Sequence, residues 1–268
     1  MSLIRVLVTG VCGTMGALVA NAVHNAPELR LVGAVDPAGV GHPLSEIVPG
    51  VPAEMLISGH LKGALEDDTP DVLVDFTSPA AVMGNIETAL SAGVACVVGT
   101  TGFSETDLQV VARMCEAKGA PAIIAPNFSL GAVLMMQCAA RAAKIFDYAE
   151  IIEYHHENKK DSPSGTAVKT AEMMAEARGE VFADPPTELQ RVPGCRGGVR
   201  SGIHIHAVRM QGYVANQEVL LGGPGETLKI AHLTTSRESF MPGVLLAVRK
   251  VREQTGLVYG LEHLLEEA

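Results

Sequence analysis

Short apolar runs alternate with amphipathic segments through the first half of the chain. These runs lie at residues 4–9, 31–35, 72–76, 94–99 and 122–125. Each run is apolar almost throughout, which is typical of parallel strands covered by helices on both faces. The alternation therefore predicts an α/β fold whose N-terminal part is a doubly wound parallel sheet.

The pattern changes after Pro126. The expected elements, in order, are a long Ala- and Met-rich helix at about 129–146, a strand ending near His155, a helix after Ser162, and strands at 203–209 and 214–221. Strands in direct succession favour an antiparallel or mixed sheet, so we predict a second, α+β domain.

Helical periodicity returns at residues 239–253, and Gly256 is expected to end that helix. We expect this segment to pack back on the first domain. The predicted domains are therefore residues 1–126 plus 237–268, and residues 127–236.

A glycine-rich loop follows the first predicted strand and opens a helix. Residues 10–16 read G-V-C-G-T-M-G, and Asp36 ends the second predicted strand 20 residues after Gly16. In this context glycines let a pyrophosphate approach the backbone N–H groups, and the acid accepts ribose hydroxyls. We predict a dinucleotide-binding, Rossmann-like domain. The alternative is a tight strand–turn–helix corner without a ligand.

The cofactor is predicted to be NADH or NADPH, with NADH favoured. Pro37 follows Asp36, and no Lys or Arg appears between Asp36 and Lys62. No nearby cation is therefore expected to neutralise a 2′-phosphate.

Two other strand ends carry polar residues. Residues 75–79 read D-F-T-S-P and residues 99–103 read G-T-T-G-F. Ligands in open α/β sheets lie beyond the carboxyl ends of strands, so we expect a cofactor role at Gly99, Thr100 and Thr101. Simple helix capping is the alternative.

Residues 153–166 read E-Y-H-H-E-N-K-K-D-S-P-S-G-T, which groups two imidazoles, two ammonium groups and a helix start. The helix cap is Ser162, with Pro163 at the first helical position, or Ser164. In either case the N–H groups of Ser164 and Gly165 are expected among the unpaired donors of the first turn. A carboxylate would bind there.

Adjacent His155 and His156 would point to opposite faces of a regular strand. We therefore expect the strand to end here and at least one imidazole to turn into a cleft between the domains, as an acid for proton transfer. Lys159 is interpreted as a clamp for a substrate carboxylate. Lys160 is expected in solvent. A solvated strand end with surface lysines is the alternative.

Composition excludes several other classes of function. The net charge is −10 and no basic stretch contains interleaved aromatic residues, so we expect no nucleic-acid partner. No apolar run reaches the about 18 residues that cross a bilayer, and no leader pattern is present, so we expect a cytoplasmic protein without a membrane partner. Five cysteines without C-x-x-C spacing favour free thiols. His204 and His206 have no obvious third ligand, so no metal is expected.

Taken together, these strings resemble the dihydrodipicolinate reductases, bacterial and plastid enzymes of the diaminopimelate route to lysine. The similarity runs through most of the chain. The matching strings are G-V-C-G-T-M-G from Gly10, D-F-T-S-P from Asp75, G-T-T-G-F from Gly99, A-P-N-F-S from Ala125, E-Y-H-H-E-N-K-K-D-S-P-S-G-T-A from Glu153, G-G-P-G-E-T-L-K-I-A-H from Gly222 and S-R-E-S-F from Ser236.

The resemblance implies reduction of 4-hydroxy-tetrahydrodipicolinate or dihydrodipicolinate, a small dicarboxylate, to tetrahydrodipicolinate by NADH or NADPH. It also implies a C-terminal domain for substrate binding and for assembly of a homotetramer. The implied proton donor is His155, with Lys159 as its catalytic partner and substrate contacts at His156, Gly165 and Thr166. Implied cofactor contacts are Gly10, Val11, Cys12, Gly13, Thr14, Met15, Asp36, Gly99, Thr100, Thr101, Ala125, Pro126, Asn127 and Phe128.

Two positions depart from the family pattern. Cys12 stands where a small residue is common, and Asn216 stands where related sequences often carry His. Two other functions stay open on the sequence alone. One is another two-domain NAD-linked dehydrogenase that shares only the first domain, and the other is a non-catalytic NAD(H) sensor that binds a partner protein.

Overall fold

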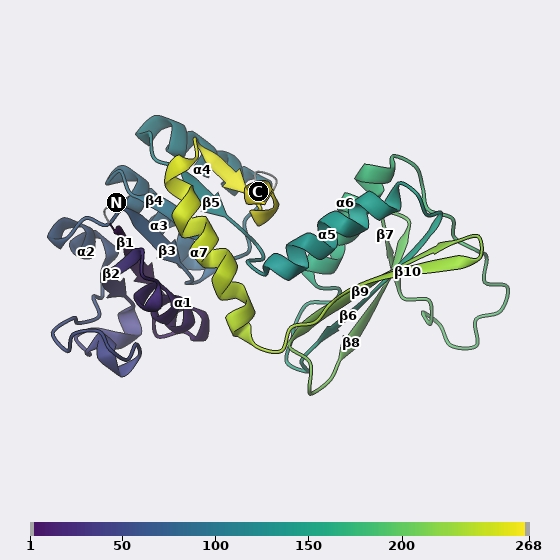
Figure 1. Cartoon of the computed structure of the whole chain (residues 1–268), viewed down its shortest axis with the longest axis horizontal. Helices are drawn as coiled ribbons and strands as arrows, with labels where there is room; N and C mark the ends of the chain where they lie inside the picture. Colours follow the sequence, from purple (N-terminus) through teal and green to yellow (C-terminus); the bar gives the residue numbers. More distant parts are fainter. Residues whose placement is uncertain (1–2, 266–268) are drawn as a thin grey trace. The chain divides into compact units, whose positions relative to one another are not determined.

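The computed structural model describes residues 3–265, and the chain folds into two units (Figure 1). The first unit runs to Phe128 and resumes at Phe240, and the second spans Ser129–Ser239. The chain therefore passes between the units near the starts of two helices, α5 (Leu130–Ala143) and α7 (Met241–Lys250).

Six parallel strands form the sheet of the first unit, in the order β11-β5-β4-β3-β1-β2. They are β1 (Ile4–Thr9), β2 (Leu29–Val35), β3 (Val72–Asp75), β4 (Ala95–Val98), β5 (Ala122–Ile124) and β11 (Leu257–Tyr259). The central strands β3, β4 and β5 are buried along their whole length, as expected for a sheet covered on both faces. The predicted α/β class and doubly wound parallel sheet are confirmed.

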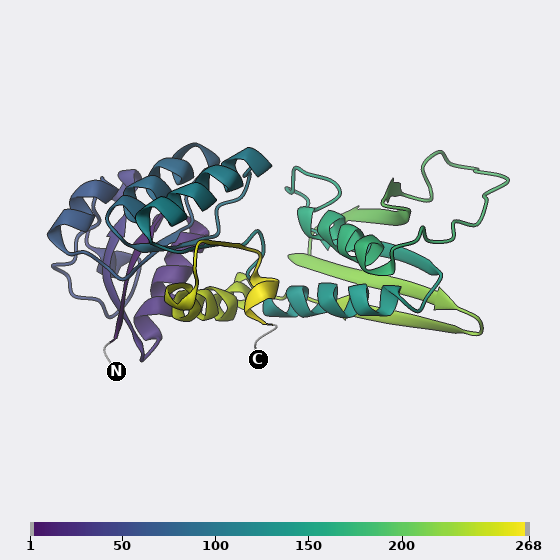
Figure 2. The same cartoon turned by 90° about the horizontal axis from the view of Figure 1, so that it is seen from above.

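Helices cover both faces of this sheet. Besides α7, they are α1 (Thr14–Asn25), α2 (Leu61–Asp67), α3 (Pro79–Ser91) and α4 (Glu105–Lys118), with 3-10 turns η1 (Pro37–Gly39), η2 (Leu44–Glu46), η4 (Val251–Glu253) and η5 (Leu261–Leu264). Figure 2 shows α2, α3 and α4 on one face and α1 and α7 on the other. Alternate strand residues such as Leu7, Leu73 and Cys96 pack with Ile86 of α3 and Val111 of α4 in one buried cluster.

The segment expected to be helical at 239–253 begins with the 3-10 turn η3 (Arg237–Phe240), continues as α7 and ends in η4. Gly256, with a positive φ of 72°, then leads into β11, which pairs in parallel with β5. Because β11 has only three residues, its sequence carries too little periodicity to predict a strand. The C-terminal part of the chain thus adds both a helix and an edge strand to the first sheet.

The second unit contains a mixed sheet in the order β10-β9-β6-β8-β7. Its strands are β6 (Tyr148–His155), β7 (Gly198–Arg200), β8 (Ile203–Arg209), β9 (Ala215–Gly223) and β10 (Glu226–His232). The central strand β6 is parallel to β8 and antiparallel to β9, so the predicted mixed α+β character is confirmed. The edge strands β7 and β10 are not predicted, because much of each is exposed and neither forms an apolar run.

Two helices, α5 and α6 (Gly165–Arg178), pack against each other and against this sheet. On β6, Ala149, Ile151 and Glu153 alternate with more exposed neighbours and are buried. Helix α6 begins at Gly165, so of the two predicted caps Ser164 is confirmed and Ser162, with Pro163 at the first helical position, is wrong. The Ser164 hydroxyl accepts the hydrogen bond from the N–H of Ala167 that a cap requires.

Candidate active site

The glycine loop of the first unit is shaped by positions where no side chain fits. Gly10 has a positive φ of 81°, and a Cβ there would lie 2.2 Å from the carbonyl oxygen of Phe76. A Cβ on Gly16 would lie 1.9 Å from the carbonyl oxygen of Gly10. Both positions therefore require glycine, and the loop is held directly against the start of α1.

The start of α1 has no side-chain cap. Its N-cap is Gly13, which makes no side-chain hydrogen bond to the first turn. Helix α1 therefore presents backbone N–H groups and the positive end of its dipole where the loop ends. These are the features that bind a phosphate group.

Asp36 lies at the end of β2, and its two carboxylate oxygens hold two backbone segments. Oδ2 accepts from the N–H of Cys12 at 3.0 Å, and Oδ1 accepts from the N–H of Ala38 at 2.9 Å. Cys12 thus joins the loop through its backbone while its side chain is exposed. Each carboxylate oxygen can accept further hydrogen bonds, as a ribose would require.

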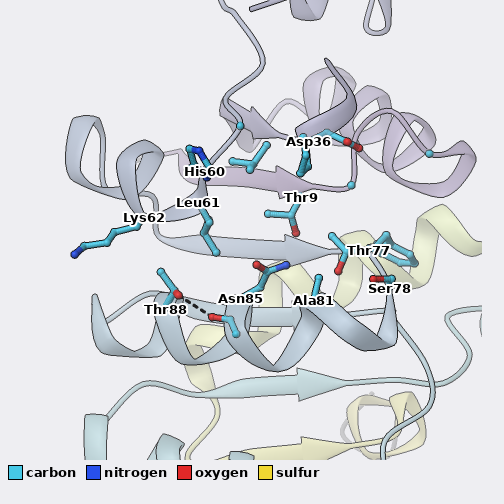
Figure 3. A pocket seen from close by; sticks show the side chains of 17 residues that line it. Thr9, Asp36, His60, Leu61, Lys62, Thr77, Ser78, Ala81, Asn85 and Thr88 are labelled. Atoms are coloured by element: carbon cyan, nitrogen blue, oxygen red, sulfur yellow. Dashed lines mark hydrogen bonds between the residues drawn. The ribbon is translucent and has the colours of Figure 1, made fainter. Parts of the chain in front are cut away.

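A cavity of about 670 Å³ lies beside this loop within the first unit (Figure 3). Its lining comprises Thr9, Gly10, Gly13, Val35, Asp36, Pro37, Gly59, His60, Leu61, Lys62, Phe76, Thr77, Ser78, Ala81, Gly84, Asn85 and Thr88. The cavity is large enough for a substantial part of a dinucleotide. The residues present therefore fit the cofactor that the glycine loop predicts.

A buried carboxylate organises the strand ends around this cavity. Asp75 is fully buried and ends β3. One of its oxygens accepts from the Thr9 hydroxyl at 2.8 Å and from the Asn85 amide at 2.7 Å. The other accepts from the hydroxyls of Thr77 at 2.8 Å and Thr100 at 2.7 Å. Asp75 thus links β1, α3 and the ends of β3 and β4 without a cationic partner among these donors.

None of the remaining predicted cofactor residues lines the cavity, and two of them, Gly99 and Phe128, lie beside Phe76. A Cβ on Gly99 would lie 2.1 Å from the Phe76 ring, and the rings of Phe76 and Phe128 are 5.7 Å apart between centroids. Val11 and Ala125 are buried, Asn127 and Met15 are half-buried, and Thr14, Thr101 and Pro126 are exposed. None of residues 99–101 and 125–128 is among the described lining residues of the cavity.

In the second unit, His155 ends β6 and rests on a carboxylate. Its Nδ1 lies 2.5 Å from Oε2 of Glu153, two residues earlier on the same strand face. The His155 side chain is 13% exposed and that of Glu153 is 0% exposed. With Nδ1 engaged by an acceptor, Nε2 is the ring nitrogen left to act on a ligand.

Glu153 is held by three partners in all. Arg209 donates from Nη1 to Oε2 at 2.8 Å and from Nη2 to Oε1 at 2.7 Å. The N–H of Ser164 donates to Oε1 at 3.1 Å. Burial raises the pKa of the Glu153 carboxyl, but the hydrogen bonds from His155 and Arg209 outweigh burial and hold the pKa below its ordinary value. Glu153 therefore stays ionised beneath the imidazole.

Lys159 lies on the loop between β6 and α6 and pairs with Asp161. The distance from Nζ to Oδ1 is 2.6 Å, and the Lys159 side chain is 22% exposed. Burial raises the pKa of Asp161, but the hydrogen bond from Lys159, a backbone hydrogen bond and the charges of Lys159 and Arg209 together outweigh burial, so the pKa lies below the ordinary value. His156 is half-buried and Lys160 is exposed.

The start of α6 differs from the prediction in one respect. The N–H of Ser164 is not an unpaired donor, because Glu153 accepts its hydrogen bond. Gly165 is exposed at the first helical position, and Thr166 follows it half-buried. The open end of this helix therefore begins at Gly165 instead of Ser164.

The two histidines of β8 have protein partners. His204 Nδ1 lies 2.6 Å from the Arg196 carbonyl oxygen, and His206 Nε2 lies 2.8 Å from Oε2 of Glu150. No group of three or more His, Cys, Asp or Glu side chains in the described chain is placed to hold a metal ion. Among residues 3–265, no helix has the length and apolar character that crossing a bilayer requires.

Sequence reasoning missed Glu153, Arg209 and Asp75. Glu153 could have been found, because residues two apart on a strand share a face and Glu153 precedes His155 by two. Arg209 could not, since its place beside His155 follows from the register of β6 with β8. Asn216 now has a structural role: it is buried, and its Oδ1 accepts from the N–H of Thr234 at 2.7 Å.

A dinucleotide-binding unit joined to a mixed-sheet unit with a carboxylate-backed histidine defines a two-domain, nicotinamide-dependent oxidoreductase. Two family models cover nearly all of the chain: dihydrodipicolinate reductase, N-terminus, matches residues 4–128, and dihydrodipicolinate reductase, C-terminus, matches residues 131–265. The chain belongs to the dihydrodipicolinate reductase family.

Individual relatives agree with this assignment. The 4-hydroxy-tetrahydrodipicolinate reductase of Moorella thermoacetica is 47% identical over 263 residues, covering 98% of each chain. That of Synechocystis sp. is 46% identical over 271 residues, again covering 98% of each. The dipicolinate-bound dihydrodipicolinate reductase from Paenisporosarcina sp. TG-14 matches with a TM-score of 0.86 and 40% identity, covering 97% of this chain and 99% of that one.

The fold is also shared with more distant enzymes. An amine dehydrogenase from Mycobacterium smegmatis matches with a TM-score of 0.67 over 95% of this chain and 94% of that one, at 13% identity. At this identity the likeness shows the fold alone.

Proposed function

We propose that this chain reduces 4-hydroxy-tetrahydrodipicolinate with NADH or NADPH, in the diaminopimelate route to lysine, and that His155 donates the proton. The family and the names of its relatives support the reaction. The observation that carries the residue assignment is the buried Glu153 carboxylate under Nδ1 of His155. It leaves Nε2 as the nitrogen that exchanges a proton with the substrate.

The nicotinamide cofactor, when bound, supplies a hydride to the substrate ring. Loss of water from the 4-hydroxy compound gives the conjugated imine dihydrodipicolinate, to which the hydride adds. Hydride addition leaves negative charge on the ring, and a proton must neutralise it. His155 provides that proton and regains one from solvent after each turnover, which an imidazole can do near neutral pH.

The substrate's carboxylates require donors, and the second unit supplies several. Lys159 is the main cationic clamp, and it exchanges its partner Asp161 for a substrate carboxylate. Gly165 and Thr166 contribute at the open end of α6, together with His156. Ser164 shapes the site through its cap and its hydrogen bond to Glu153. The dipicolinate bound by the Paenisporosarcina relative supports a dicarboxylate ligand.

The first unit binds the cofactor. Residues 10–15 and the first turn of α1 hold the pyrophosphate, and Asp36 accepts the ribose hydroxyls. Gly99 and Phe128 lie beside Phe76 and mark the nicotinamide end of the site. Thr100, Thr101 and residues 125–127 contribute to the same end. NADH is preferred, because a 2′-phosphate would approach the Asp36 carboxylate. Lys62 lines the same cavity, but its side chain points away from Asp36 (Figure 3).

The working protein is a homotetramer in the cytoplasm. On β6, Ile152 lies between the buried Ile151 and Glu153 and is half-exposed, as is Leu220 of β9. Half-exposed apolar side chains on this sheet face support assembly through the second unit. All five cysteines are free thiols, which suits a reducing compartment.

A coupled absorbance assay tests the reaction. The synthase product made from pyruvate and aspartate semialdehyde is supplied with NADH, and oxidation of NADH is followed. Rapid oxidation that depends on the synthase product is the expected result. Tight NADH binding without oxidation would instead indicate an NAD(H) sensor. Oxidation only with another imine or carbonyl substrate would indicate a different dehydrogenase.

A further inference from the structure

The carboxylate beneath His155 belongs to a larger buried arrangement. Glu153 and Arg209 form an ion pair in which Glu153 is fully buried and the Arg209 side chain is 19% exposed. Replacing such a pair with apolar residues is often neutral or stabilising, so stability alone does not explain it. A role in positioning the reacting groups explains the presence of this buried ion pair.

We propose, on the basis of the function proposed above, that Glu153 is the positioning residue of His155 and that Arg209 anchors both Glu153 and the Lys159 loop. Glu153 fixes the imidazole through Nδ1, so that the proton available to the substrate resides on Nε2. It also stabilises the imidazolium that exists before proton transfer. The same logic explains why carboxylates orient histidines in other active sites.

Arg209 reaches this position through the sheet. In the parallel register of β6 and β8, Arg209 stands opposite His155, so both project from the same face as Glu153. Besides its two bonds to Glu153, its Nη2 donates to the carbonyl oxygen of Asp161 at 2.8 Å and its Nη1 to that of Val208 at 2.8 Å. Only Nε lacks a partner among the described residues.

Through Asp161, Arg209 also restrains the loop that carries Lys159. Asp161 offers its carbonyl oxygen to Arg209 and its carboxylate to Lys159. The titratable and charged side chains that bond Glu153 are therefore His155 from its own strand and Arg209 from β8. Asp161 and Lys159 of the following loop connect to Glu153 through Arg209. One guanidinium connects the carboxylate that orients the acid with the loop that carries the substrate clamp.

The same strand offers a matched control. Glu150 bonds an imidazole and a guanidinium as well, with Oε2 2.8 Å from Nε2 of His206 and Oε1 2.8 Å from Nη2 of Arg196. It stands three residues before Glu153, hence on the opposite face of β6, and its side chain is 37% exposed. A Glu150→Gln change removes an equivalent charge without touching His155.

The test compares the full-length parent with Glu153→Gln, Glu153→Asp, His155→Ala and Glu150→Gln. The readouts are kcat across a range of pH, NADH affinity, and the tautomer of His155 from nitrogen-15 NMR. Glu153→Gln should lower kcat by about 10- to 100-fold and leave NADH affinity unchanged. Its pH profile should differ from that of the parent, because the side chain that contacts the imidazole no longer carries a charge. NMR should show loss of the fixed Nδ1–H tautomer.

Glu153→Asp covers the case in which Glu153→Gln fails to fold, since it keeps the charge but withdraws the carboxylate by one methylene. We expect a reduced kcat with a pH profile near that of the parent. Glu150→Gln should match the parent in rate and pH profile.

The outcomes separate this inference from the proposed function. An inactive His155→Ala together with parental kcat, pH profile and tautomer in Glu153→Gln would overturn the positioning role and leave the function standing. A fully active His155→Ala would overturn the proton-donor assignment itself. If Glu153→Gln does not fold, Glu153→Asp decides the test. A parental kcat in Glu153→Asp, or a loss of kcat equal to that in Glu150→Gln, would then overturn the positioning role.

Discussion

The backbone N–H of Ser164 donates to Oε1 of Glu153 at 3.1 Å, so the cap of α6 is tied to the carboxylate that holds His155. This bond joins two parts of the site that the sequence presents as neighbours only along the chain. It joins the proposed anion-binding end of α6 and the proposed proton donor, His155, to one buried carboxylate. Changes at either part are therefore expected to affect the other.

The first prediction separates the acid from the clamp. His155→Ala should lower kcat by about 10²- to 10⁴-fold with a smaller effect on KM, because proton donation acts in the transition state. Lys159→Ala should lower kcat and raise KM together, since a charge-assisted hydrogen bond of about 1.5–3 kcal/mol also serves the bound substrate. Lys160→Ala, at an exposed position, is the control. Steady-state kinetics equal to the parent in His155→Ala would contradict the assignment.

A second prediction concerns the glycine loop. Gly10 and Gly41 have similar φ values of 81° and 78°, but a Cβ on Gly41 would meet nothing within 4 Å. Both Gly→Ala variants should lose about 1–2 kcal/mol of unfolding free energy from backbone strain. Only Gly10→Ala should also clash with the Phe76 carbonyl and weaken NADH binding, by about tenfold or more. Equal NADH affinity in the two variants, measured by titration, would rule out a special role for Gly10.

A third prediction tests the buried acid of the first unit. In the parent, donors from four residues bond the two carboxylate oxygens of Asp75. Asp75→Asn replaces one of these oxygens with an amide nitrogen, which cannot accept their hydrogen bonds. We expect a loss of about 1–3 kcal/mol in unfolding free energy and weaker NADH binding, because the strand ends at the cavity lose their common partner.

Asp107→Asn provides the control for this change. Asp107 belongs to the exposed capping box of α4, so its loss should lower the stability slightly without changing NADH affinity. Urea denaturation and fluorescence titration give the two quantities. Asp75→Asn with parental NADH affinity would show that the network only stabilises the fold.

The sequence predicts strands well where they are buried and apolar. Strands β3, β4 and β5 lie in the middle of a covered sheet, and their apolar runs are therefore continuous. The edge strands β7 and β11 have three residues each, too few for periodicity to reveal them. Edge strands need only one partner, which leaves their sequences less constrained.

The residues of the candidate site likewise differ in how far the sequence predicts them. His155, Lys159 and Gly165 are recognisable because they lie within one segment, as are the residues of the glycine loop. Arg209 lies 56 residues after Glu153, and only the pairing of β6 with β8 brings them together. Asp75 is visible as a strand end, but its donors come from three other segments. Contacts that depend on register or on several elements are thus out of reach of pattern reasoning.

The last prediction concerns the acid stability of the second unit. Burial raises the pKa of Glu153, but the hydrogen bonds from His155 and Arg209 more than offset it, so the folded pKa lies below the ordinary value of 4.5. Such a carboxyl binds fewer protons in the folded chain than in the unfolded chain. Its contribution to stability is therefore complete above the unfolded pKa and is lost as pH falls through the folded pKa.

Glu153→Gln removes this titration and leaves Arg209 without its anion, so near neutral pH the variant should be less stable by about 3–5 kcal/mol. The difference should narrow as the pH falls below about 4.5, because at position 153 only the parent has a carboxylate that becomes protonated there. Tyrosine fluorescence during urea unfolding is a suitable probe, since the chain has no Trp and Tyr148, Tyr154 and Tyr213 all lie in the second unit. Glu87→Gln, exposed on α3, should follow the parent throughout. A difference that stays constant across this range would show that the Glu153 carboxyl does not titrate with the lowered pKa on which the prediction rests.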